Sequence, residues 1–159
     1  MKVNIYIADT NRMPGTTERN IGVIVQDPRR GRKGEKTATF YPYATRYVAV
    51  AQTIVLILDR FTRPADITFY IDCSYVVGKL KRFPQKDGTA KSTLDRWQEG
   101  GWITRRGTKV EHKDNWQRLY NKLRVFEQAG GSFDYEKLED EEMIGRIESL
   151  IETAKKNDG

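Results

Sequence analysis

The hydrophobic pattern of this chain changes its period near residue 45, and this change limits the possible folds more than any other feature. Residues 3–7 alternate with period two, as in a β-strand that buries one face, and segments 21–25 and 36–43 follow as further strands. Residues 45–61 then carry apolar side chains at helical spacing. Three strands in succession, joined by short connections, predict an antiparallel meander followed by a helix.

The rest of the chain alternates between the two kinds of element. Segment 67–71 is rich in β-branched and aromatic residues and is a predicted strand, and 132–138 is a candidate for the fifth strand. Helices are expected at 74–80, at about 95–101 and at 140–156, and a further helix is expected to begin with Asp114 as its N-cap. Residues 102–110 are expected to form an exposed segment. We therefore predict an α/β fold in one domain over 1–159, built on a five-stranded mixed sheet with helices on both faces.

Composition narrows the class of protein. No stretch of about 18 consecutive apolar residues is present, so we expect no membrane span. The strand pattern starts at the first residues, which predicts no signal peptide and a cytoplasmic protein. Cys73 and His112 are the sole residues of their kinds, which excludes an internal disulfide framework and a site with several histidines. We expect a soluble monomer.

Charge is distributed unevenly along the chain. Residues 1–133 carry a net charge of +11 and residues 134–159 a net charge of −5. Much of the excess lies in a basic segment at 81–113, and the acids gather in a predicted helix at 139–159. A basic body favours a polyanionic partner such as nucleic acid. The alternative is a solvated surface on an ordinary basic protein.

Two aspartates, Asp9 and Asp72, each follow a predicted strand. If those strands are neighbours, the two carboxylates meet at one edge of the sheet. Carboxylate oxygens are ligands that Mg²⁺ prefers, so the pair predicts a site for one or two cations. The alternative is that each aspartate caps the turn or helix that follows it.

Two segments together resemble bacterial-type (type 1) ribonuclease H. The first is 72–77, Asp-Cys-Ser-Tyr-Val-Val, which is similar to an Asp-Ser-x-Tyr-Val segment of that family. The second runs from 97 to 119 and resembles the family's basic handle and the helix after it, with Trp97, Trp102 and a Trp-Gln-Arg-Leu sequence at 116–119. Both occur in the family's order, and the resemblance covers about residues 1–125.

The resemblance implies a ribonuclease H-like fold and cleavage of the RNA strand of RNA/DNA hybrids. It also implies Mg²⁺ or Mn²⁺ held by an Asp, Glu, Asp, Asp set. Asp9 and Asp72 fall at the first and third ligands, and Val48 replaces the glutamate. For the fourth ligand, Glu142 (or Glu141) is the candidate, although acids in the first turn of a helix also offset its dipole. The predicted catalytic residues are Asp9, Asp72 and Glu142, with Asp9 and Asp72 as metal ligands.

The handle implied by the resemblance grips a nucleic-acid backbone. Tryptophan and cations suit contacts to sugar and phosphate, which position a duplex without reading its sequence. The alternative for the tryptophans is that they pack the helices onto the sheet. The predicted nucleic-acid-binding residues are Trp97, Trp102, Arg105, Arg106, Lys109, Thr45 and Arg46.

The incomplete carboxylate set shapes the predicted function. We expect a divergent ribonuclease H-like protein that binds an RNA/DNA hybrid or related duplex, with weakened or lost endonuclease activity because Val48 cannot bind a metal. One alternative is an active enzyme that uses Mg²⁺ or Mn²⁺ in a rearranged site. The other is a protein-interaction module on the same scaffold.

Overall fold

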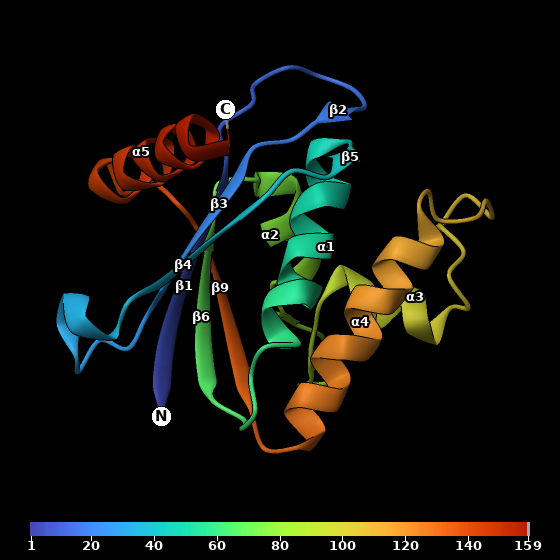
Figure 1. Ribbon diagram of the computed structural model, residues 1–159. Coiled ribbons are helices and arrows are strands. Elements are labelled where there is room, and N and C mark those ends of the chain that lie inside the picture. The colour runs from blue at the N-terminus through green and yellow to red at the C-terminus, as the bar shows by residue number, and fades with distance from the viewer. Residues whose placement is uncertain (159) are drawn as a thin grey trace.

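A computed structural model describes residues 1–158 and shows a mixed five-stranded sheet with β1 at its centre (Figure 1). The strand order is β4-β3-β1-β6-β9. β3 runs antiparallel to both β1 and β4, while β6 runs parallel to β1 and to β9. The predicted fold class is confirmed. The strand bounds are β1 Lys2–Asp9, β3 Ile21–Gln26, β4 Lys36–Phe40, β6 Asp66–Ile71 and β9 Ser132–Lys137.

Helices cover both faces of this sheet. α1 and α4 pack against each other over one face, with α2 beside them, and α5 lies across β3, β1 and β4 on the other face (Figure 1). None of the helices within 1–158 has the length and apolar character needed to cross a membrane. The helix bounds are α1 Arg46–Leu58, α2 Ser74–Leu80, α3 Thr93–Glu99, α4 Lys113–Gln128 and α5 Glu141–Asp158.

The alternation in β1 explains the two layers of the core. Its odd-numbered residues, Val3, Ile5 and Ile7, are buried in the larger core with α1 and α4. On the opposite face Ala8 packs in a smaller cluster with Met143 and Ile147 of α5. Because Asp9 follows Ile7 by two residues, its side chain is on the α1 side of the sheet.

Five short elements were not predicted. Two-residue strands β2 (Thr17–Glu18) and β5 (Tyr43–Ala44) pair with each other, and so do β7 (Phe83–Pro84) and β8 (Ala90–Lys91). A single 3₁₀ turn, η1 (Gly31–Gly34), lies between β3 and β4. The β2–β5 pair fastens the loop after β1 to the residues that lead into α1.

Two local predictions are wrong. α4 begins at Lys113 with His112 as N-cap in the left-handed conformation (φ 57°), so Asp114 lies in the first turn, where its charge offsets the helix dipole. The segment 102–110 is not exposed throughout, because Trp102 and Val110 are buried and their backbones pair, with Val110 N donating to Trp102 O at 3.1 Å. The polar residues between them form the turn of a hairpin.

Candidate nucleic-acid interface

The parallel pairing of β1 with β6 brings Asp9 and Asp72 together at one edge of the sheet. The backbone amide of Asp9 donates a hydrogen bond to Asp72 Oδ2 at 3.3 Å. Both residues are buried, Asp9 completely. The convergence expected from the two strand ends is therefore present, and what the pair can do depends on the groups around it.

The Asp9 carboxylate is fully engaged by this chain's own groups. Its Oδ1 accepts hydrogen bonds from the backbone amides of Asn11 (3.0 Å) and Asn20 (3.2 Å). Its Oδ2 lies 3.2 Å from Arg19 Nη1 and 3.6 Å from Arg46 Nε. Four donors on two oxygens leave little room for a further ligand, so Asp9 organises the loop after β1.

Arg19 is the buried partner in this arrangement, with a side chain only 1% exposed. Its Nε donates to Ala44 O at 3.0 Å, and its Nη groups donate to Asn11 O and Gly15 O. A buried guanidinium is tolerated when its donors are satisfied, as they are here. The β2–β5 pair places Arg19 there, because Arg19 directly follows β2.

Asp72 is less completely paired. Arg12 Nη1 lies 3.8 Å from Asp72 Oδ2, and the Arg12 side chain is 62% exposed. Within the described residues, Asp72 Oδ1 is buried without a hydrogen-bond partner. Burial raises the pKa of the Asp72 carboxyl, and the nearby charges of Arg12 and Arg46 oppose that effect. The sheet edge thus combines two carboxylates with three guanidinium groups.

The structure does not bring a third acid to this edge. Across residues 1–158, no three side chains of His, Cys, Asp or Glu are grouped so that they could hold a metal ion. Val48 is buried in the core. Glu142 is exposed at the start of α5, beside Met143, which packs on the opposite face of the sheet. Glu142 lines a hollow there with Glu35 and Arg146. The residues present do not fit a pair of divalent cations.

The handle cations lie on a separate projection. Residues 103–109 form a tight hairpin in which Ile103 pairs with Lys109 and Thr104 N donates to Thr108 O at 2.8 Å. Arg105 and Arg106 occupy the turn of that hairpin and are exposed, as is Lys109. None of these three cations forms an ion pair with any residue the structure describes. They are available to an external anion.

The tryptophans have mainly structural surroundings. Trp102 is 4% exposed, and its Nε1 donates to Gln98 Oε1 at 2.9 Å. Trp97 is half-buried and packs against Trp102 and Trp116. Trp102 thus has almost no surface for a nucleic acid, which favours the packing alternative for it.

Thr45 and Arg46 lie at the start of α1, at the sheet edge and not at the handle. The Thr45 hydroxyl oxygen is buried, so it has no open face toward a duplex. Arg46 is 27% exposed and divides its guanidinium between Asp9 Oδ2 and Asn11 O, the latter 2.8 Å from Nη2. Arg46 retains a small accessible surface beside the exposed Arg12.

Sequence reasoning missed several residues that join these regions. The Tyr75 ring on α2 is 49% exposed, and Lys79 Nζ lies 4.7 Å from its centroid and 5.5 Å from that of Trp97. The contact between Tyr75 and Lys79 could have been predicted from their spacing, since residues four apart on a helix share one face. Arg12 and Arg19 follow a strand and carry no motif, so their partners depend on the fold.

Comparison with known proteins supports the fold. No protein-family model matches the chain. Curated proteins named ribonuclease H do: the protein from Prosthecochloris aestuarii is 23% identical over 95 residues, which is 60% of this chain and 59% of that protein. The protein from Symbiobacterium thermophilum is 26% identical over 94 residues, or 59% and 58% of the two chains. The chain is therefore similar to proteins named ribonuclease H over about 60% of its length.

Solved ribonuclease H structures share the fold. LC9-RNase H1, described as a type 1 RNase H with the type 2 active-site motif, matches with a TM-score of 0.60 at 16% identity, over 88% of this chain and 64% of that one. RNase H1 from Halobacterium salinarum NRC-1 matches with a TM-score of 0.51 at 13% identity, over 94% of each chain. This chain spans less than two thirds of the length of the curated proteins it matches.

Proposed function

We propose that this chain binds an RNA/DNA hybrid or a related duplex and has lost most or all metal-dependent cleavage. The observation that carries the proposal is the pairing of the Asp9 carboxylate with Arg19, Arg46 and two backbone amides. In the resemblance to ribonuclease H, Asp9 takes the place of a metal ligand. Here guanidinium groups lie where a cation would have to approach.

The energetics disfavour an exchange of arginine for metal. Freeing Asp9 would break a buried ion pair and leave the Arg19 guanidinium without its charged partner, a change that typically costs about 3–5 kcal/mol. A divalent ion would also meet the positive charges of Arg12, Arg19 and Arg46. Mg²⁺ prefers about six oxygen ligands in an octahedral arrangement, and two crowded carboxylates supply few of them.

The binding part of the proposal depends on unpaired positive charge. Arg105, Arg106 and Lys109 are exposed on the handle hairpin. Between the hairpin and the sheet edge, the Tyr75 ring and Lys79 ammonium offer an aromatic face and a cation on α2. Phosphate contacts from such side chains give affinity without sequence specificity.

A rearranged, active ribonuclease H is the second candidate, and one observation favours it. Asp72 Oδ1 is buried and has no hydrogen-bond partner among the described residues, so one carboxylate oxygen remains for a cation or a proton. The raised pKa of Asp72 favours the proton. The unpaired Oδ1 of Asp72 therefore supports an active enzyme less strongly than the pairing of Asp9 with arginines supports the loss of cleavage.

Fluorescence anisotropy with a labelled hybrid in EDTA tests the binding proposal. We expect saturable binding in the absence of divalent ions, with affinity that falls steeply as salt rises because counterions are released. Binding that is absent at low salt would contradict the proposal and favour the protein-interaction alternative. Single-stranded and duplex DNA of the same length, measured in parallel, define which duplex is preferred.

A further inference from the structure

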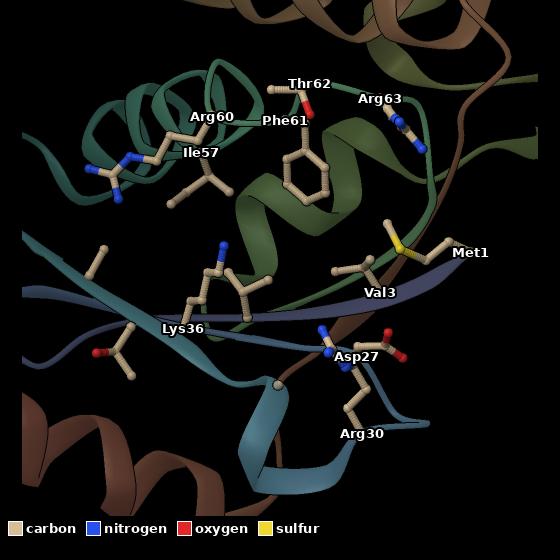
Figure 2. A pocket seen from close by; sticks show the side chains of 14 residues that line it. Met1, Val3, Asp27, Arg30, Lys36, Ile57, Arg60, Phe61, Thr62 and Arg63 are labelled. Atoms are coloured by element: carbon tan, nitrogen blue, oxygen red, sulfur yellow. The ribbon is translucent and has the colours of Figure 1, made fainter.

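The feature that carries a further inference lies at the opposite end of β1 from Asp9. It is a hollow of about 390 Å³ between the C-terminal end of α1, the start of β1 and the β3–β4 connection (Figure 2). Its apolar lining includes Val3, Val25, Ile57 and Phe61. We call this region the basic hollow, because cations surround that apolar lining.

Four cations line the hollow: Arg30, Lys36, Arg60 and Arg63. Arg30, Lys36 and Arg63 are exposed, and none of them forms an ion pair with a residue the structure describes. The one acid in the lining, Asp27, is engaged by Arg29, with Nε 3.3 Å from Oδ1. Like charges gathered around one hollow repel each other, and a bound anion would relieve that repulsion.

The directions of the side chains suggest how a ligand would lie. Figure 2 shows the Phe61 ring projecting from the end of α1 into the hollow, with Lys36 and Arg30 pointing toward it from the sheet side. Arg63 approaches from another side, whereas the Arg60 guanidinium points away and lies over the Phe40 ring at 5.3 Å. The hollow therefore has one aromatic surface and cations spread around it.

We propose that the basic hollow binds a nucleotide with a short phosphate chain, of the size of a nucleoside diphosphate. A planar base can stack on Phe61 inside the apolar lining. A diphosphate carries enough negative charge to meet cations on different sides, and arginine suits phosphate oxygens particularly well. The volume lies in the range of small-ligand pockets. This site is independent of hybrid binding, because it lies away from both the sheet edge and the handle.

Isothermal titration of the full chain with ADP, and separately with inorganic pyrophosphate, tests this proposal. We expect saturable binding of both. The double variant Lys36→Gln/Arg63→Gln weakens both by at least about tenfold, because each lost cation removes a charge-assisted contact. Phe61→Leu weakens ADP by about threefold to tenfold and leaves pyrophosphate within about twofold, since only ADP has a base to stack.

The matched control is Lys86→Gln/Lys156→Gln, which removes the same charge from exposed residues outside the lining and should keep wild-type affinity. Circular dichroism confirms that each variant is folded, and the exposed Lys36 and Arg63 can be changed without disturbing the core. The proposal is overturned if millimolar ADP gives no saturable heat, or if Lys36→Gln/Arg63→Gln binds as wild type does. Saturable binding of oleate that ADP does not displace would also overturn it, in favour of an acyl ligand.

Discussion

At the scale of single residues, the contacts of Arg19 and Arg46 with Asp9 are the basis of the proposed loss of metal binding. Asp9 occurs at the strand end where the resemblance expects a ligand, yet its two oxygens are shared among Arg19, Arg46 and backbone amides. Asp72, its neighbour, keeps one oxygen unpaired. Under the proposed function, Asp9 stabilises the loop after β1 instead of holding a cation.

Arg19→Met tests that structural role. Asp9 would keep only the partly exposed Arg46 as a charged partner, and Ala44 O would lose its donor, so we expect the free energy of unfolding to fall by about 3–5 kcal/mol. Urea unfolding followed by circular dichroism measures this change. Arg12→Met is the matched control and should cost less than about 1 kcal/mol, because Arg12 is exposed and its contact is long. Equal losses in the two variants would contradict the role given to Arg19.

Asp72 gives a prediction with a definite dependence on pH. Burial raises the pKa of its carboxyl in the folded state, so the stability that Asp72 contributes is present below the unfolded-state pKa and is lost as pH rises through the folded-state pKa. Asp72→Asn removes the buried charge. The variant should be more stable than wild type near about pH 8, and the difference should shrink toward about pH 4.

Thermal unfolding at the two pH values measures this difference. Asp27→Asn is the control of opposite sign, since hydrogen bonds from Arg29 lower the pKa of Asp27 and removing that charge should cost stability at the higher pH. A loss of stability in Asp72→Asn at the higher pH would show that the ionised Asp72 is stabilising, contrary to this account.

At the scale of elements, the hairpin at 103–109 carries the predicted contact to phosphate. Arg105→Gln/Arg106→Gln should weaken hybrid binding and reduce the slope of log affinity against log salt by about 2, because each phosphate contact contributes about one unit. Anisotropy titrations at several salt concentrations give this slope. Lys33→Gln/Lys156→Gln removes the same charge elsewhere and should leave the slope nearly unchanged. If both variants lowered it equally, net charge and not the hairpin would explain binding.

The elements also show where sequence reasoning succeeds. The change from strand to helix period predicted β1, β3, β4 and α1, and the strand ends predicted that Asp9 and Asp72 meet. It failed for β2 and β5, because two-residue strands have no periodicity. Those strands place Arg19 against Asp9. The buried Arg19–Asp9 ion pair therefore could not be predicted from the hydrophobic pattern of the sequence.

At the scale of the whole molecule, burial shows which handle residues pack in the core and which remain exposed. Trp102 matches the resemblance in sequence, but its backbone takes a left-handed conformation (φ 63°) and its ring is buried against Tyr120 and Trp97. Arg105 and Arg106, three and four residues later, remain exposed. Sequence alone does not separate these outcomes, because aromatic residues suit both a core and a nucleic-acid surface. Glu142 likewise lies where α5 carries it, away from Asp9 and Asp72.

The most direct test of the central claim measures binding and cleavage together on one labelled RNA/DNA hybrid. Protein is titrated in Mg²⁺, in Mn²⁺ and in EDTA, with anisotropy recording binding and a denaturing gel recording cut RNA. We expect similar affinity in all three conditions and intact RNA. Cleavage that requires Mg²⁺ or Mn²⁺ and disappears in Asp72→Asn would contradict this expectation, and would establish a working metal centre at the paired aspartates.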